Sequence, residues 1–471
     1  MREVDFGTAP LTPYRDVLGA DRLDRLREAA EHVAVALHGR RVWNINSTSA
    51  GGGVAELLHA LLPLARAVGI DARWLVIDGD PEFFAIAKRL CTRLYGAPGD
   101  PEPLGTEQLR HYRKITELNG TALAEWVRPG DVVVVHEAQP AGLVDVARRL
   151  GATAVWRRHI GRDVPNEHTR DGWAFLRRFV EHADATVFLT EQHRPDWAPR
   201  PHIIPPSIDP CAPKNMELTD QEILDVLRCT GVLDGGDGEP VTVRPPVGER
   251  IEVRRPVTAV REGPPPPATV PMVVQVSRWD ELKDMEGVLH AFLAADVPGS
   301  YLTLAGADVE GVADDPDAAR FFDDCCRRWA ALPEEDRRRV QLLCLPMEDL
   351  RENAVVVNAL QRHATVVVQK SLAEGFGLTA TEAMWKGRPL VASGVGGLRD
   401  QVVDGESGLL LDDPHDLGAA AGLIRRLLTD PELARRLGEG ARRRVDEHYL
   451  PDRHLLDWAN LIGSAVAMEV V

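Results

Sequence analysis

The stretch Val366-Val-Val-Gln-Lys-Ser-Leu-Ala-Glu374-Gly-Phe-Gly377-Leu-Thr-Ala-Thr-Glu382-Ala-Met-Trp-Lys-Gly387 contains the pattern that decides the fold. Its three valines predict a buried strand, the glycines permit a tight turn, and Gly387 ends a short helix. Thr379 and Glu382 have the spacing of a capping box at the start of that helix. Because a helix N-terminus attracts anions, we expect a phosphorylated sugar donor here, with the two carboxylates free to bind neutral hydroxyls. The alternative is that Glu374 is a solvated loop residue and Glu382 only a cap.

The same alternation of buried strands and amphipathic helices extends outward over most of the chain. Strands that are apolar on both faces and alternate with helices predict parallel, doubly wound sheets, so the fold class is α/β. The predicted strands cover residues 42–46, 73–77, 131–136, 152–157, 186–190, 203–207, 272–276, 301–306, 340–344, 366–368, 389–391 and 408–411.

Two doubly wound domains are therefore predicted, 1–210 and 272–450. Between them, 211–271 is rich in glycine and proline and predicts a linker that carries an inserted hairpin. The final stretch, 451–471, predicts an amphipathic helix that either completes the second domain or crosses back to the first.

The composition narrows the class of protein. With 72 acidic and 55 basic residues among 471, the net charge of -17 argues against nucleic acid or an anionic membrane as the main partner. The six cysteines have no paired C-x-x-C spacing, and we expect reduced thiols. The sequence also shows no signal peptide, membrane-spanning run or zinc-ligand spacing. These features predict a soluble, cytoplasmic protein without a bound metal.

Two further loops follow predicted strands, where open α/β sheets bind ligands. Gly51, Gly52 and Gly53 lie between the first strand and its helix, which is the geometry of a phosphate cradle but lacks both the dinucleotide fingerprint and a P-loop. The alternative is a tight turn. In the second domain, Arg278 and Lys283 could neutralise a leaving diphosphate, or form a surface pair with nearby carboxylates.

Two histidines also end strands of the first domain. His136 and His159 are expected to face a cleft between the domains and to favour a polar ligand. The alternative for each is a hydrogen-bonded structural histidine. No nucleophile signature is found in the sequence.

Together these motifs resemble the retaining GT-B glycosyltransferases of family four, whose signature is Glu-x7-Glu around a Glu-Gly-Phe-Gly-Leu turn. Within that family the pattern is most similar to the trehalose glycosyltransferring synthases, and the likeness extends over nearly the whole chain. The stretches that carry it are 42–48, 51–56, 156–160, 206–209 and 381–387. The resemblance implies two Rossmann-like domains facing across a cleft, the first on the acceptor side and the second binding the nucleotide sugar.

The resemblance also implies a reaction. Glucose would pass, with retained anomeric configuration, from a nucleoside-diphosphate glucose to a sugar acceptor, with glucose expected as acceptor and trehalose as product. No tightly bound cofactor is implied, and Mg²⁺ is compatible but not required. The nucleotide base and a homodimeric state stay open.

The site residues follow the same resemblance, position by position. The catalytic set is His159, Arg278, Lys283 and Glu374, in which the cations bind diphosphate and Glu374 holds sugar hydroxyls. Glu382 would hold the ribose diol. The donor-binding set adds Gly52, Gly53, Gly375, Phe376, Gly377, Leu378 and Glu382, and the acceptor-side set is Asn46, His136, Arg158 and Asp163.

Some positions depart from the pattern and leave the acceptor open. Gly161 stands where the pattern has Asp, Asp163 follows two positions later, and Asp284 stands where the pattern has Gly. The insertion around 231–271 is also longer than the pattern. The alternatives are therefore a trehalose phosphorylase, a glucosyltransferase for a secondary metabolite or polyol, and a non-catalytic protein that binds sugar nucleotides.

Overall fold

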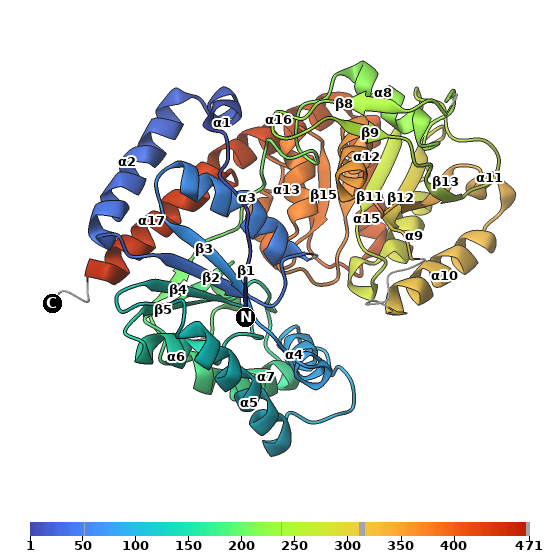
Figure 1. Cartoon of the computed structure of the whole chain (residues 1–471). Coiled ribbons are helices and arrows are strands. Elements are labelled where there is room, and N and C mark those ends of the chain that lie inside the picture. The colour runs from blue at the N-terminus through green and yellow to red at the C-terminus, as the bar shows by residue number, and fades with distance from the viewer. Residues whose placement is uncertain (51, 237, 310–315, 468–471) are drawn as a thin grey trace. The chain divides into compact units, whose positions relative to one another are not determined.

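The computed structural model describes residues 1–50, 52–236, 238–309 and 316–467. The described chain divides into two compact units (Figure 1). The first unit comprises Met1–Asp209 with the described part of Tyr449–Val471, and the second comprises Pro210–His448. Each unit is built around its own sheet, as the α/β pattern predicted.

The sheet of the first unit is parallel except at one edge. Its strand order is β1-β3-β2-β4-β5-β6-β7, and only the β1–β3 pair among the described strands runs antiparallel. Its strands are β1 (Arg2–Glu3), β2 (Val42–Asn46), β3 (Ala72–Val76), β4 (Val132–His136), β5 (Thr153–Arg157), β6 (Ala185–Phe188) and β7 (Pro201–Ile203). Its helices are α1 (Leu11–Leu18), α2 (Ala20–Leu37), α3 (Gly53–Ala67), α4 (Pro81–Leu94), α5 (Thr106–Leu123), α6 (Leu143–Arg149), α7 (Glu167–Val180), the short turn η1 (Glu191–His193) and α17 (Pro451–Ala467).

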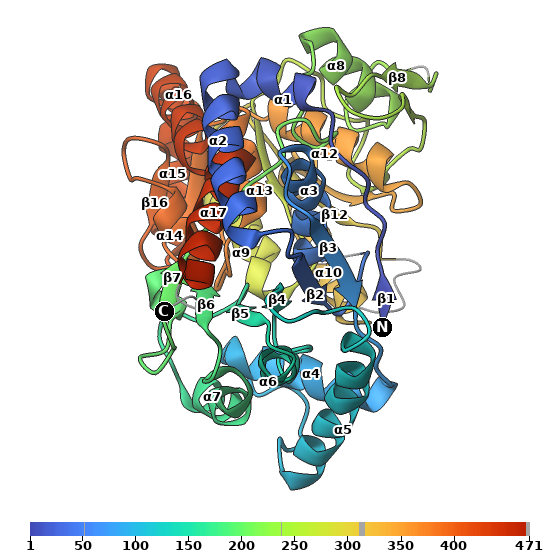
Figure 2. The same cartoon turned by 60° about the vertical axis from the view of Figure 1, so that its left-hand side comes forward.

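Helices cover both faces of this sheet. Figure 1 shows α4, α5, α6 and α7 on one face and α2, α3 and α17 on the other. The first of these layers buries a core that includes Phe83, Tyr112 and Trp156. On the second face, α17 lies beside α2, and Leu461 and Ile462 pack with Val33 (Figure 2). The C-terminal helix is thus part of the first unit's core.

The sheet of the second unit follows the order β10-β13-β12-β11-β14-β15-β16. Its neighbours are parallel except for the β10–β13 pair. The strands are β10 (Thr258–Val260), β11 (Met272–Val276), β12 (Tyr301–Ala307), β13 (Val340–Leu345), β14 (Val366–Gln369), β15 (Leu390–Ser393) and β16 (Leu409–Leu411). The helices and the short turn η2 are α8 (Asp220–Cys229), η2 (Glu281–Lys283), α9 (Met285–Ala295), α10 (Pro316–Ala330), α11 (Glu334–Arg337), α12 (Leu350–His363), α13 (Leu378–Trp385), α14 (Gly397–Gln401), α15 (Leu417–Thr429) and α16 (Pro431–His448).

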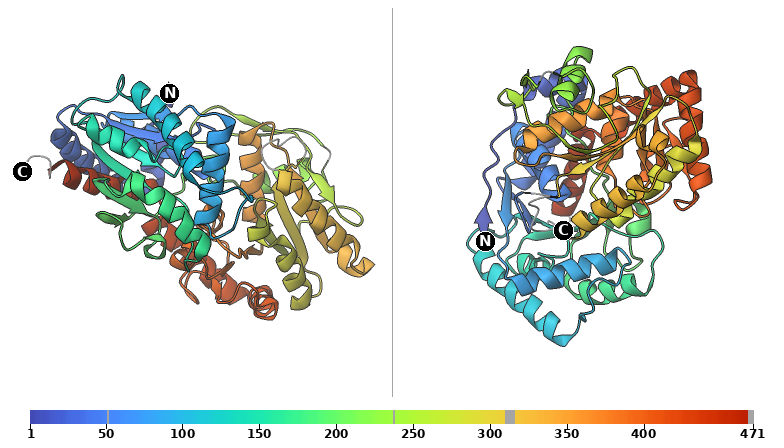
Figure 3. Two further views of the ribbon diagram at one scale, coloured as in Figure 1. Left: turned by 90° about the horizontal axis from the view of Figure 1, so that it is seen from below. Right: turned by 90° about the vertical axis from the view of Figure 1, so that its right-hand side faces the viewer.

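Helices lie on both sides of this sheet as well (Figure 3). The central strands β11 and β14 are buried along their whole length, as expected for parallel strands covered on both faces. Because parallel strands end at the same sheet edge, the loops after β11, β14 and β15 come together there.

The segment 211–271, expected as a linker, is packed within the second unit. It contains α8, a hairpin of β8 (Val241–Val243) and β9 (Ile251–Val253), and the edge strand β10. The buried carboxylate of Glu352, on α12, accepts hydrogen bonds from the backbone N–H groups of Arg254 and Arg255 at 2.6 and 2.7 Å. These contacts hold the insertion against the helix.

Candidate functional site

The turn that follows β14 differs from the capping box expected there. Gly377 is the N-cap of α13, with a left-handed φ of 89° and no side-chain cap, and the helix already begins at Leu378. The capping-box prediction for Thr379 and Glu382 is therefore wrong. Because Thr379 lies inside the first turn, Glu382 is placed within the helix, where its side chain is only 7% exposed.

The segment that follows β15 makes hydrogen bonds to the backbone of this turn. The N–H of Gly397 donates to the carbonyl of Gly375 at 3.0 Å, and the amide of Gln401 donates to the carbonyl of Phe376. A Cβ atom at Gly396 would lie 1.8 Å from the carbonyl oxygen of Glu374. The backbone of the 374–378 turn is thus held by contacts that leave no room for a side chain at position 396.

Lys283 and Glu374, predicted from separate motifs, meet at this sheet edge. The ammonium Nζ of Lys283 lies 2.5 Å from Glu374 Oε2, which also accepts a hydrogen bond from Ser371 Oγ at 3.1 Å. Their side chains are 14% and 11% exposed. Because both side chains are largely desolvated, their Coulomb attraction is screened less than that of a surface ion pair, and the contact holds both groups in position.

Arg278 is arranged differently. Its side chain is 66% exposed, and Nη2 lies 3.0 Å from Asp280 Oδ2. This is the surface pair weighed as the alternative in the sequence. An exposed pair of this kind contributes little stability, so the guanidinium can be redirected to an anionic ligand at small cost.

Two residues that sequence reasoning missed support the same edge. Lys370 is buried and forms an ion pair with Asp284, whose backbone has a left-handed φ of 47° and whose side chain caps α9. Gln275 joins the two loops by accepting from the N–H of Lys370 at 2.9 Å and donating to the carbonyl of Lys283 at 2.7 Å. Lys370 immediately follows β14, and this strand-end position is the signal that could have identified it.

Glu382 has basic neighbours. Lys214 Nζ lies 3.7 Å from Glu382 Oε1, with its side chain 25% exposed. Lys386, four residues after Glu382 at the C-terminal end of α13, is buried and donates to Gln361 Oε1 at 2.8 Å. Burial lowers the pKa of Lys386 to about 7, and the nearby Glu382 carboxylate opposes that shift. Lys214 was also missed, because it lies in the stretch expected to be a linker.

In the first unit, the two strand-end histidines lie against each other. His136 Nδ1 is 3.0 Å from His159 Nε2, and the rings stack at 5.2 Å between centroids. His136 Nε2 is also 3.0 Å from Asn44 Oδ1, so both ring nitrogens of this buried side chain are used. Burial, with Arg157 nearby, holds the pKa of both histidines well below the usual value, so they are neutral imidazoles.

Glu137 orients the backbone next to this pair, and sequence reasoning missed it. Its φ is 73°, and its carboxylate accepts from the N–H of His159 at 2.5 Å and from the guanidinium of Arg158. Burial raises the pKa of Glu137, while Arg158 opposes the rise. The carboxylate thereby fixes the loop that presents His159.

The remaining residues predicted for the site in the first unit differ in burial and in the contacts they make. Asn46 is buried, accepts from Trp74 Nε1 at 2.7 Å and donates to the carbonyl of Thr48 at 2.7 Å. Gly52 has a left-handed φ of 78° and caps α3, which begins at Gly53, whereas Gly51 lies outside the described residues. Asp163 Oδ1 lies 3.3 Å from His193 Nε2. The amide of Asn46 is thus used inside the fold.

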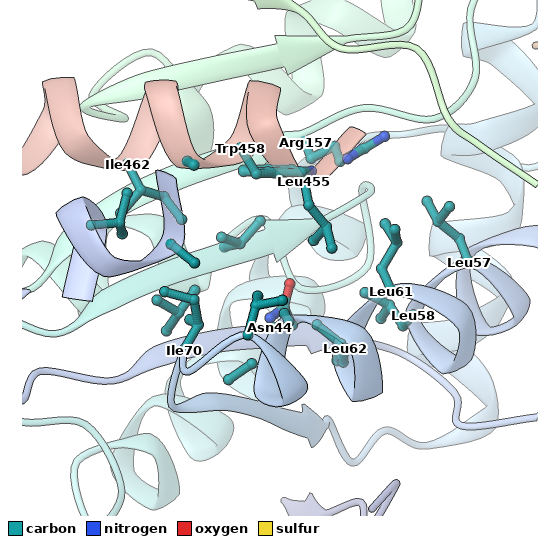
Figure 4. Close-up of a pocket in the computed structure, with 18 of the residues that line it drawn as sticks. Asn44, Leu57, Leu58, Leu61, Leu62, Ile70, Arg157, Leu455, Trp458 and Ile462 are labelled. Carbon is teal, nitrogen blue, oxygen red and sulfur yellow. The ribbon is translucent and has the colours of Figure 1, made fainter. Parts of the chain in front are cut away.

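The first unit contains a small apolar cavity (Figure 4), and His136 is among the residues that line it. Leu57, Leu61 and Leu62 of α3 face Leu455 and Trp458 of α17 across it, with Asn44 at its side. Its volume is about 80 Å³, and most of its lining is formed by apolar side chains that belong to the buried core of the unit. We therefore assign it to the core and not to the site.

Helix α17 also contacts Arg157, the last residue of β5, through His454. His454 Nε2 lies 3.1 Å from the buried Arg157 Nη1, and its Nδ1 lies 3.0 Å from Ser207 Oγ. Burial lowers the pKa of Arg157 to about 9 and holds the pKa of His454 well below its usual value. A neutral His454 can accept from the guanidinium, which ties α17 to the sheet.

These buried histidines predict an acid-sensitive first unit. Because His136, His159 and His454 stay neutral in the fold, only the unfolded chain takes up their protons as the pH falls below about 6.5. Stability is therefore unaffected above that pH and is lost below it, by about 1.4 kcal/mol per pH unit for each histidine. Urea unfolding between pH 7.5 and 5.5 measures this slope. His454→Gln should make it shallower, whereas His182→Gln, at an exposed position, should not; equal slopes for both variants would contradict the assignment.

The structure also bears on membrane and metal binding. Within residues 1–50, 52–236, 238–309 and 316–467, the structure contains no helix with the length and hydropathy of a membrane span. In the same ranges, no three His, Cys, Asp or Glu side chains form a group able to hold a metal ion.

Comparison with known proteins identifies the family. The family model for the N-terminal domain of trehalose synthase matches residues 44–195, and the model for group 1 glycosyl transferases matches residues 351–444. The chain is 34% identical to a trehalose synthase from Pyrococcus horikoshii, with 98% of each chain covered. It is 32% identical to one from Rubrobacter xylanophilus, with 98% of this chain and 100% of the relative covered. A trehalose phosphorylase from Pleurotus pulmonarius is 25% identical over 97% of this chain but 60% of its own length.

Solved structures share the fold. An α,α-trehalose 6-phosphate synthase from Burkholderia multivorans matches with a TM-score of 0.63 at 15% identity, covering 92% of this chain and 99% of the other. Anabaena HepE, in complex with UDP-glucose, matches with a TM-score of 0.58 at 14% identity over 91% and 99%. The full-length likeness to trehalose synthases, together with two doubly wound units, shows that the chain belongs to the trehalose synthase family and is a glycosyltransferase with the GT-B fold.

Proposed function

We propose that the chain transfers glucose from a nucleoside-diphosphate glucose to free glucose, with retained anomeric configuration, to give trehalose. The observation that carries the proposal is the Lys283–Glu374 pair at the sheet edge beside the 374–378 turn. It joins a cation suited to phosphate and a carboxylate suited to hydroxyls in one fixed position. The names of the full-length relatives support the same product.

In the second unit, the proposed donor contacts follow from these positions. Arg278 and Lys283 bind the diphosphate, Glu374 accepts hydrogen bonds from the sugar hydroxyls, and the Gly375–Leu378 backbone lines the sugar pocket. Glu382 binds the ribose diol. Arg278 is solvent-exposed and can turn to the ligand, whereas Lys283 is already placed by Glu374. The two cations stabilise the charge that develops as the diphosphate leaves.

In the first unit, we propose that His159 contacts the donor sugar and that the loop at Gly52 and Gly53 approaches phosphate. A neutral imidazole can orient a hydroxyl without adding charge. Of the acceptor-side residues, which also include Asp163, Arg158 receives more support than Asn46 and His136. Two of its guanidinium nitrogens have no hydrogen-bond partner among the described residues, whereas the polar atoms of Asn46 and His136 are used within the unit.

The proposed reaction needs no protein nucleophile. The bond between the glucose C1 and the diphosphate oxygen breaks, the acceptor hydroxyl forms its new bond to C1 on the same face, and its proton passes to the departing phosphate oxygen. The protein positions the reactants and stabilises charge. A retaining hydrolase would instead hold two carboxyls about 5–5.5 Å apart across the sugar. Here Glu374 and Glu382 bind different parts of one donor.

A trehalose phosphorylase activity is the second candidate. The fungal phosphorylase relative favours it, although this chain spans 60% of that protein's length. In that reaction inorganic phosphate takes the place of the nucleotide. Because inorganic phosphate has no ribose, Glu382 would have no diol to bind. The ordered position of Glu382 beside Lys214 therefore supports a nucleotide donor. We place the activity in the cytoplasm, with the six cysteines as free thiols.

A donor-by-acceptor screen tests the proposal. The purified chain is incubated with ADP-, UDP- or GDP-glucose and with glucose, polyols or no acceptor, with and without Mg²⁺, and products are read by mass spectrometry. We expect a disaccharide from glucose with at least one donor. Phosphate-dependent breakdown of trehalose without any nucleotide-dependent synthesis would favour the phosphorylase, and the absence of any product with glucose would contradict the trehalose assignment.

A further inference from the structure

The first unit contains a polar pocket whose lining residues the sequence motifs explain only in part. It has a volume of about 210 Å³ and lies between the loop after β5, the start of α7 and η1. Arg158, Gly161, Thr169, Trp173 and His193 are among its lining residues.

His193 is the central polar group of this pocket. The residue is 4% exposed, yet neither ring nitrogen has a hydrogen-bond partner among the described residues. Nε2 lies 3.3 Å from Asp163 Oδ1, an ion-pair distance at which the orientation does not make a hydrogen bond. Buried polar groups are almost always hydrogen-bonded, so an unsatisfied imidazole that lines a pocket points to a ligand.

Gly161 explains how the ring reaches this position. A Cβ atom at residue 161 would lie 2.3 Å from His193 Cγ. No other side chain at this position can coexist with the ring where it stands. The glycine and the histidine therefore act as a pair, and Asp163 supplies the carboxylate beside them.

Arg158 brings further donors to the pocket. It is 1% exposed, and its Nη1 forms an ion pair with Glu137. Its Nε and Nη2 atoms have no hydrogen-bond partner within the described part of the chain. A ligand with several oxygen atoms could satisfy these donors and the imidazole together.

The charges around the pocket select the kind of ligand. Arg158 is paired with Glu137, His193 faces Asp163, and Arg194 Nε lies 2.9 Å from Glu191 Oε2. The guanidinium groups of Arg158 and Arg194 already have carboxylate partners. Arg162, which also lines the pocket, is exposed and donates to the carbonyls of Val164 and Tyr95, and the carboxylate of Asp196 in the same lining would repel a phosphate. The half-buried Trp173 adds an apolar wall. Neutral hydroxyls combined with an apolar ring face fit this lining.

We propose that this pocket binds the acceptor hexose and that His193 selects the unphosphorylated sugar by hydrogen bonding to its hydroxyls. The inference rests on the proposed function and names the acceptor subsite for it. Asp163 lies beside the ring, Gly161 leaves room for it, and Arg158 donates to the same sugar.

Steady-state kinetics of His193→Ala test the inference, with His182→Ala as a matched control at an exposed position. We expect the KM for glucose to rise by about 10-fold or more, because a site left with unpaired polar groups discriminates strongly. The KM for the nucleotide sugar and its acceptor-independent hydrolysis should be unchanged. An unaltered KM for glucose, or glucose 6-phosphate preferred over glucose by the unmodified enzyme, would overturn the proposal.

Direct binding separates this inference from the proposed function. Ligand-observed NMR measures glucose binding to the full chain, to His193→Ala, and to His193→Gln in case the alanine variant fails to fold. If no transfer occurs but glucose binds and both variants lose it, the pocket stands as a sugar site while the proposed reaction falls. If glucose binds equally to all variants, or does not bind to the unmodified chain, the pocket assignment is wrong.

Discussion

Lys283→Ala should lower kcat/KM for the nucleotide sugar by about 10²–10³-fold, the scale seen when one preorganised charge-stabilising group is removed. Lys283 is the only partly buried cation among the described residues that the structure pairs with Glu374, at 2.5 Å. Its loss removes the charge that we propose for diphosphate binding and leaves the carboxylate of Glu374 without its ammonium partner. Initial rates at varied donor concentration measure the effect.

Two comparisons make this result specific. Lys114→Ala removes an exposed lysine of α5 and should leave kcat/KM unchanged. Lys283→Arg retains the charge and should recover part of the activity, with the loss set by the different shape of the guanidinium. Circular dichroism and urea unfolding distinguish lost chemistry from lost folding. If Lys283→Ala kept kcat/KM within about 10-fold of the unmodified enzyme, its proposed role in charge stabilisation would be wrong.

Gly396→Ala should destabilise the second unit by about 3 kcal/mol or more and abolish donor binding. The φ of 49° and ψ of -141° at this residue suit only glycine, and a Cβ atom would lie 1.8 Å from the carbonyl oxygen of Glu374. The 374–378 turn must therefore move to make room. Urea unfolding and calorimetric titration with nucleoside diphosphate measure the two effects.

Matched glycine variants separate the clash from backbone strain. Gly405 also has a positive φ, 75°, but nothing lies within 4 Å of its Cβ position, so Gly405→Ala should cost only about 1–2 kcal/mol. Gly422 lies exposed in α15 with equally open space, and Gly422→Ala should stabilise by about 1 kcal/mol. Both controls should bind nucleotide normally. Equal stability of the Gly396 and Gly405 variants would show that the turn is not held by this contact.

The sequence predicted the α/β sheets well because their strands are apolar on both faces. The stretch 366–368 lies within β14 and the stretch 272–276 coincides with β11, so the loops that follow them were placed at the correct sheet edge. That placement brought Lys283 and Glu374 into one hypothesis before their 2.5 Å contact was known. Hydrophobic periodicity and the position of a residue at the end of a strand can both be read from the local sequence, and the folded structure retains them.

The errors arose where distant contacts override local preference. The pattern at Thr379 fits a capping box, but Gly377 adopts a left-handed conformation and starts the helix earlier. Proline and glycine made 211–271 look like a linker, although Glu352 binds its backbone from α12. No local signal placed His193 against Gly161, because their contact joins loops that follow different strands.

The two residues that were missed beside the proposed donor site share one property. Lys214 and Lys370 each contact an acidic side chain far away in sequence, Glu382 and Asp284 respectively. Single charged residues carry no pattern, and most lie on solvated surfaces. Only the sheet topology shows which of them meet.

NMR analysis of the transfer product tests the central claim most directly. The unmodified chain is given nucleoside-diphosphate glucose with a ¹³C label in the sugar, together with unlabelled glucose, and the anomeric carbons of the product are assigned. The account predicts trehalose in which the labelled glucose keeps its α configuration and is joined through both anomeric carbons. A labelled β-linked product, a linkage to another hydroxyl, or label recovered only as free glucose would contradict it.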